Sequence, residues 1–157
     1  MAHVGIVPSR MARMAAPWAK FSLPGDAPAY ARGQSPEFVR TVREVFGPLV
    51  EPVRDFPAGP LLWALAEVRG DGSLPTFFRN LEKKLAPAGS LWVVLPKKPF
   101  APELGFPYTW LDVQKAGLSA GLVDNKIAAF SPRLTSIRFV IPVARRKTGS
   151  SRRTADS

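Results

Sequence analysis

The chain has 157 residues, a length typical of one domain, and 46% of them are hydrophobic, which is ordinary for a globular protein. It contains no cysteine and a single histidine, His3, so disulfides and thiolate chemistry are excluded, and a histidine-based triad or a transition-metal site is disfavoured. The sequence has no apolar run near the ~20 residues that a membrane-spanning helix needs. We therefore expect a cytoplasmic protein without a membrane span or a metal site.

The formal net charge of +10 is concentrated at the two ends of the chain. Residues 1–25 contain basic side chains and no acid, and residues 144–157 contain five basic side chains against one acid, Asp156. The five basic residues are Arg145, Arg146, Lys147, Arg152 and Arg153. The composition predicts a flexible segment over 1–20, one α/β domain over 21–143 and a basic disordered tail over 144–157. The tail is either a solvated extension or a segment that attracts the phosphates of a nucleic acid.

In the first third of the chain, prolines and glycines predict loop or extended structure over residues 16–35. Ser35, Pro36 and Glu37 then form a typical helix start, with serine as the N-cap and proline in the first turn. Apolar residues at helical spacing, among them Phe38 and Val42, predict that this helix continues to about residue 49. A short strand is expected over residues 50–56.

The middle of the chain predicts two strands around a helix. An apolar run over residues 61–66 has the length of a strand, and the turn residues Gly70, Asp71 and Gly72 follow it. Ser73 is a plausible N-cap for an amphipathic helix that reaches residue 85 and that Gly89 closes. Residues 91–95 are apolar without alternation, which is typical of a strand covered on both faces. The two tryptophans of these strands, Trp63 and Trp92, are expected in the core.

The last third predicts a helix over residues 108–120, loosened by Gly117, and two strands over 122–130 and 135–143. Residues 131–133 suit a hairpin turn between those strands. Strands alternating with helices indicate an α/β fold with a mostly parallel sheet. The expected architecture is a small α/β domain whose sheet ends in a C-terminal antiparallel hairpin.

Three segments carry a resemblance to known proteins: residues 89–98, 121–126 and 134–140. Their residues, order and spacing resemble those of a bacterial family, domain-of-unknown-function family three-zero-five-two, over about residues 60–146. The order of elements also looks like the C-terminal half of a class I methyltransferase, a Rossmann-like fold. That resemblance implies that residues 91–95 are the fifth strand and that the final hairpin carries the sixth and seventh.

A methyltransferase of this class holds S-adenosylmethionine on a glycine-rich loop after the first strand, with an acid at the end of the second strand on the ribose. Here Gly25 and Gly33 are isolated, and the sequence shows no apolar strand before either. Gly70 and Gly72 begin a similar pattern, but Pro75 stands where a third glycine is needed, and the pattern follows a later strand. We therefore expect no bound cofactor, with S-adenosylmethionine as the alternative.

Ligands of open α/β sheets bind beyond the carboxyl ends of strands, and two lysines follow the strand over residues 91–95 at such an end. If the final hairpin folds toward them, several cationic groups could hold a phosphate or a carboxylate. This candidate anion site consists of Lys97, Lys98, Asn125, Lys126 and Arg138. The alternative is that the lysines are a charged end to a buried strand. No catalytic residue is identified, and the best single acid, Asp124, is expected to pair with a neighbouring cation.

Four aromatic residues cluster in and beside the proline-rich loop after that strand: Phe100, Phe106, Tyr108 and Trp110. They either line a pocket or a partner groove or cover the edge of the sheet.

The first functional hypothesis is a non-enzymatic binding or interaction protein, with an unknown protein partner, on a degenerate methyltransferase-like scaffold. The alternative is an S-adenosylmethionine-dependent methyltransferase or a binder of nucleotide or phosphate ligands. A further alternative is a nucleic-acid-associated protein acting through the tail. The enzyme hypothesis predicts a pocket near Lys97 that includes residues 21–34. It requires that the side chains of Phe21, Leu23 and Tyr30 do not fill this pocket. Sequence leaves the oligomeric state open.

Overall fold

A six-stranded sheet runs through the centre of the computed structural model, which describes residues 16–146. The strand order is β2-β1-β3-β4-β6-β5; the first four strands are mutually parallel, and β6 is antiparallel to both β4 and β5. This confirms the predicted α/β class and the antiparallel hairpin at the end of the chain. The strands are β1 (Tyr30–Arg32), β2 (Glu51–Pro52), β3 (Leu61–Glu67), β4 (Leu85–Pro96), β5 (Val123–Ala129) and β6 (Leu134–Val140).

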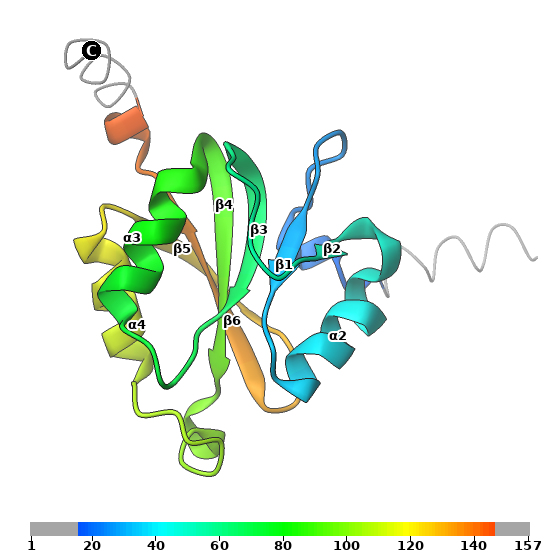
Figure 1. Cartoon of the computed structure of the whole chain (residues 1–157), viewed down its shortest axis with the longest axis vertical. Coiled ribbons are helices and arrows are strands. Elements are labelled where there is room, and N and C mark those ends of the chain that lie inside the picture. The colour runs from blue at the N-terminus through cyan, green and yellow to red at the C-terminus, as the bar shows by residue number, and fades with distance from the viewer. Residues whose placement is uncertain (1–15, 147–157) are drawn as a thin grey trace, which may run out of the picture.

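Helices cover both faces of the sheet (Figure 1). Helix α2 (Pro36–Phe46) packs on one face, and α3 (Leu74–Lys84) and α4 (Trp110–Ser119) pack on the other. Three short 3-10 turns are also present, η1 (Ala19–Phe21), η2 (Gly47–Leu49) and η3 (Lys98–Phe100), and residues 143–146 after β6 are helical. Among the helices of residues 16–146, none has the length and apolarity to cross a membrane.

The helix starts follow from side chains that cap free backbone amides. The Ser35 hydroxyl accepts a hydrogen bond from the Phe38 amide at 3.2 Å, and Ser73 does the same for Thr76 at 3.3 Å, so both predicted N-caps are confirmed. Helix α4 begins with a reciprocal capping box between Thr109 and Asp112.

Two apolar layers hold the sheet between its helices. On the α2 face, Trp63 and Trp92 are almost completely buried, as predicted, and both indole N–H groups donate to the Phe21 carbonyl oxygen, at 2.8 and 3.0 Å. On the other face, Phe78 of α3 meets Phe139 of β6 edge-on at 5.0 Å. The 3-10 turn η1 is therefore part of the core because it supplies both an aromatic ring and a buried acceptor.

Gly117 supports α4 rather than loosening it. A Cβ placed there would lie 2.3 Å from the Phe139 ring, so the missing side chain lets the helix approach β6 closely. The sequence predicts that Gly117 loosens the helix, but α4 continues through this residue and uses it to pack against β6.

The prediction that Gly89 closes the preceding helix is wrong, because β4 already begins at Leu85. The pairing with β3 is irregular there: Leu61 lies opposite Leu85, but Trp63 lies opposite Ser90. A Cβ at Gly89 would stand 2.5 Å from the Leu61 carbonyl oxygen. The glycine therefore marks a close approach between two strand backbones, not the end of a helix.

Residues 16–35, predicted as loop or extended chain, contain the 3-10 turn η1 and the short strand β1. The strand predicted over residues 50–56 shortens to β2, which has only two residues. Both strands are too short to show periodicity in sequence, and pairing with their neighbours defines them instead.

Helix α2 is fixed to the β5–β6 hairpin by a buried carboxylate. The Glu37 side chain is 8% exposed, and its carboxylate accepts hydrogen bonds from the Ser131 hydroxyl and from the backbone and guanidinium of Arg133. Burial alone would raise the pKa of Glu37, but the hydrogen bonds from Ser131 and Arg133 outweigh it, and the pKa lies below the ordinary value for glutamate.

Replacing Glu37 by glutamine is expected to lower the free energy of unfolding at pH 7 by about 1–2 kcal/mol. Because the folded state lowers the pKa, the stabilisation by Glu37 is present above the unfolded value of about 4.3 and is lost as the pH falls below it. Urea denaturation at pH 7 and at pH 3 measures this. The difference from wild type should shrink at pH 3, and the exposed control Glu44→Gln should show little change at either pH. A constant difference at both pH values would contradict the proposed role of the charge.

Candidate ligand cleft

The strand order places a topological switch point between β1 and β3. After β1, the chain crosses by α2 to β2 on one side, and it then returns to β3 on the other side of β1. The loops that leave β1 and β3 therefore diverge to opposite faces of the sheet. In open α/β sheets, ligands bind in the crevice outside the carboxyl ends of the strands at such a point.

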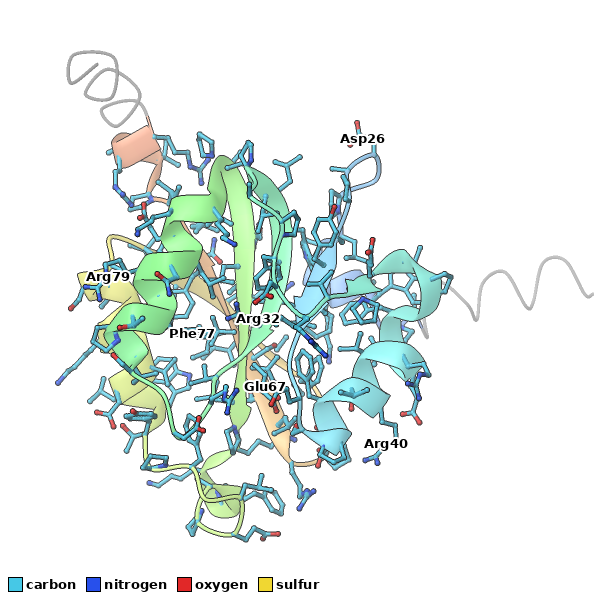
Figure 2. The ribbon with its side chains drawn as sticks, in the orientation of Figure 1. Asp26, Arg32, Arg40, Glu67, Phe77 and Arg79 are labelled. Carbon is cyan, nitrogen blue, oxygen red and sulfur yellow. The ribbon has the colours of Figure 1, made fainter. Side chains whose placement is uncertain are left out.

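An open cleft of about 740 Å³ lies at this switch point. Its lining comes from the carboxyl ends of three parallel strands: residues 32–34 at the end of β1, 53–55 after β2 and 67–69 at the end of β3. Residues 72–74, Thr76 and Phe77, at the start of α3, line it as well. The volume is in the range of pockets that hold small organic ligands. In Figure 2, Arg32 and Glu67 lie in the middle of the molecule, between α2 and α3, and Phe77 lies at α3.

The loop from β1 to α2 is held close to β3. A Cβ added at Gly33 would lie 2.4 Å from the Phe38 ring and 2.8 Å from the Glu67 Cβ, so only glycine fits. The backbone amides of Gln34 and Ser35 each donate to Glu67 Oε1 at 3.0 Å, and the Ser35 hydroxyl donates to Oε2. The one glycine of this loop is thus required by packing between helix and strand.

Four charged side chains line the cleft without an ion-pair partner among residues 16–146: Arg32, Arg54, Asp55 and Glu67. The Arg32 guanidinium lies 4.9 Å from the centre of the Phe56 ring, a cation–π distance. Burial lowers the pKa of Arg32, while the negative charge of Asp55 acts in the opposite direction. Arginine binds carboxylates and phosphates in two-pronged geometry, and an exposed carboxylate accepts hydrogen bonds from sugar hydroxyls.

The loop between β4 and α4 supports one wall of the cleft. The Tyr108 hydroxyl donates to the Gly72 carbonyl oxygen at 2.6 Å, and a Cβ at Gly70 would lie 2.9 Å from the Gly105 carbonyl oxygen. Of the four aromatic residues expected either to line a pocket or groove or to cover the edge of the sheet, Phe106 is buried, and Phe100, Tyr108 and Trp110 are half-buried. None of the four lines the cleft, but Tyr108 positions a loop that does.

The residues predicted to form one anion site lie in two separate parts of the structure. Lys97 and Lys98 follow β4, and the Lys97 ammonium donates to the Pro132 carbonyl oxygen at 3.0 Å. Arg138 lies opposite Trp92, five residues before Lys97 on β4, which corresponds to roughly 16 Å along the strand.

The hairpin members of that set have other partners. Arg138 donates to the Ser90 hydroxyl at 3.0 Å, Lys126 donates to the Lys20 carbonyl oxygen at 2.8 Å, and Asn125 is exposed on β5. The candidate acid Asp124 accepts from the Gln114 amide at 3.2 Å. None of these residues lines the cleft at the switch point.

The C-terminal basic residues fall partly within the described chain. The Arg145 guanidinium donates to the Gly121 carbonyl oxygen at 2.7 Å and pairs with Glu82 at 2.6 Å. Arg146 donates to the Ile141 carbonyl oxygen at 2.8 Å. Lys147, Arg152 and Arg153 lie outside the described residues. Within residues 16–146, no group of three or more acidic or histidine side chains gathers as a metal site would require.

The chain has a methyltransferase-like Rossmann fold, as comparison with solved structures shows. The N-methyltransferase NodS from Bradyrhizobium japonicum WM9 is 14% identical with a TM-score of 0.56, over 87% of this chain and 98% of NodS. The methyltransferase CcbJ from Streptomyces caelestis is 12% identical with a TM-score of 0.53, over 81% of this chain and 94% of CcbJ.

A third similar structure, the O-methyltransferase NcsB1 in complex with S-adenosylmethionine, is 10% identical with a TM-score of 0.57, over 86% of this chain and 55% of NcsB1. At such identities, the likeness establishes the fold alone. No family model and no curated protein matches the sequence, so the resemblance to domain-of-unknown-function family three-zero-five-two stays a prediction. The described sheet has six strands, one fewer than the methyltransferase resemblance implies.

Proposed function

We propose that this protein binds S-adenosylmethionine, or a nucleoside ligand of closely similar chemistry, in the cleft at the switch point. The observation that supports the proposal most directly is the position of Asp55. It follows β2, lines the cleft and stands about 20 residues after Gly33, the spacing at which Rossmann-type folds place the acid that binds the ribose hydroxyls.

The other residues of the cleft suit the rest of such a ligand. Arg32 offers a guanidinium to a carboxylate, and Phe77 adds an aromatic surface on the α3 side. Phe21, Leu23 and Tyr30 leave the crevice open, since the first two pack in the α2-face core and Tyr30 packs against the core on the opposite face. When bound, S-adenosylmethionine would supply an electrophilic methyl group, so methyl transfer to a small acceptor is the activity that this proposal implies.

Thermal unfolding with S-adenosylhomocysteine tests the proposal. At 100 times the dissociation constant, the ligand stabilises by about 2.7 kcal/mol, which corresponds to roughly 5–10 °C for a domain of this size. Asp55→Asn is expected to weaken binding about 10-fold, because it removes a charged hydrogen-bond acceptor. The matched control is Asp26→Asn, on a loop that Figure 2 shows far from the cleft. It should leave the affinity unchanged.

A melting temperature that does not change with ligand would contradict the proposal. It would instead favour the first hypothesis from sequence, an interaction protein that keeps the methyltransferase scaffold without its ligand. Equal losses in Asp55→Asn and Asp26→Asn would contradict the specific role given to Asp55.

A further inference from the structure

The backbone amides of the loop between β1 and α2 already bind a carboxylate from the protein itself. Glu67 ends β3, and its carboxylate takes the amide hydrogens of Gln34 and Ser35 as well as the Ser35 hydroxyl. In Rossmann-type folds, a ligand phosphate accepts hydrogen bonds from the amides of this loop and of the helix that follows. Glu67 therefore occupies the position of a ligand's anionic group.

A second anion at this loop would find both amides engaged and would lie beside a negative charge. Like charges at short range repel strongly where solvent screening is weak, and Glu67 is half-buried. Of the basic side chains that line the cleft, Arg32 lies on the other face of the sheet. Arg32 pairs in register with Ala66, so its side chain leaves β1 on the face opposite to that of Glu67, toward Phe56 and α3.

We propose that Glu67 is the specificity-determining residue of the cleft, and that it excludes phosphorylated nucleosides by filling the phosphate position at the β1–α2 loop. The carboxylate of a nucleoside with an amino-acid arm is held by Arg32 instead. This inference rests on the proposed function, because it divides nucleoside ligands into those that the cleft accepts and those that it rejects.

Calorimetric titration of the full chain with S-adenosylhomocysteine, adenosine and ADP tests the role of Glu67. The wild-type protein should bind S-adenosylhomocysteine at least 10-fold more tightly than ADP. Glu67→Ala frees two amides and removes the charge, so it should bind ADP at least 10-fold more tightly than wild type. Glu67→Gln, which removes the charge and keeps an acceptor oxygen, should show a smaller gain and serves if the alanine variant does not fold.

A matched control separates the charge from the loop contacts. Ser35→Ala removes one hydrogen bond to Glu67 and the N-cap of α2, but it leaves the carboxylate on the amides of residues 34 and 35, so it should still reject ADP. Equal gains of ADP affinity in Ser35→Ala and Glu67→Ala would overturn the proposal, because loosening of the loop would then explain both.

Arg32→Ala tests the other half of the proposal. It should weaken S-adenosylhomocysteine binding at least 10-fold and leave the affinity for adenosine, which lacks a carboxylate, within 2-fold of wild type (both figures on the order expected for a charged hydrogen bond). Arg40→Ala, on the outer surface of α2 in Figure 2, should change neither affinity. An equal loss for both ligands in Arg32→Ala would overturn the role of Arg32 in holding the carboxylate.

The outcomes of these titrations separate the inference about Glu67 from the proposed function on which it rests. If the wild-type protein binds S-adenosylhomocysteine and ADP equally, the selectivity of Glu67 is overturned and the proposed function stands. If the wild-type protein binds none of the three ligands, both are overturned. Tighter binding of ADP than of S-adenosylhomocysteine would overturn the selectivity and would identify the cleft as a phosphate site.

Discussion

Replacing Phe21 by alanine is expected to lower the free energy of unfolding by about 3–5 kcal/mol. Its ring is 1% exposed and meets Trp92 at 4.9 Å and Phe46 at 5.2 Å, both edge-on. Domains of this size are stable by only ~5–15 kcal/mol in total, so one side chain before the first strand would account for a large part of it. Urea denaturation followed by tryptophan fluorescence measures the loss.

Trp18→Ala is the matched control for Phe21→Ala. Trp18 lies three residues earlier in the same segment and is 39% exposed, so its replacement should change stability by less than ~0.5 kcal/mol. Similar stabilities for Phe21→Ala and the wild-type protein would mean that η1 does not contribute to the core in solution.

The substitution Gly33→Ala is expected to destabilise the protein by roughly 1–3 kcal/mol and to weaken nucleoside binding. The new methyl group would enter the space of the Phe38 ring and of the Glu67 Cβ, and neither can move without disturbing α2 or β3. Denaturation and calorimetric titration with S-adenosylhomocysteine measure the two effects. Gly25→Ala is the control because no atom lies within 4 Å of its added Cβ. An unchanged affinity in a destabilised Gly33→Ala would contradict the link between this loop and the ligand.

The fold could be predicted wherever local chemistry and burial indicate the same structure. Ser35 and Ser73 are followed by proline-containing first turns and apolar stripes, and both helices begin where these signals place them. The unbroken apolar runs that contain Trp63 and Trp92 are the two buried central strands. Alternation across residues 135–140 likewise indicates a strand of the final hairpin.

The cleft could not be predicted because its first strand has almost no sequence signal. Tyr30, Ala31 and Arg32 have neither alternation nor an apolar run, and β1 exists because β2 and β3 pair with it on both sides. Without β1, Gly33 is an isolated glycine and the switch point is invisible. The sequence signal for a ligand site is then strongest at Lys97, which follows the apolar run over residues 91–95.

The bonds of Arg145 determine where the C-terminal basic segment can be cut. A deletion that begins at residue 145 removes positive charge, and it also breaks a bridge that joins Glu82 of α3 to the turn after α4. Loss of nucleic-acid binding in such a truncation would therefore report on folding as much as on charge. A boundary after residue 146 keeps the bridge, and it allows the charge of Lys147, Arg152 and Arg153 to be tested alone.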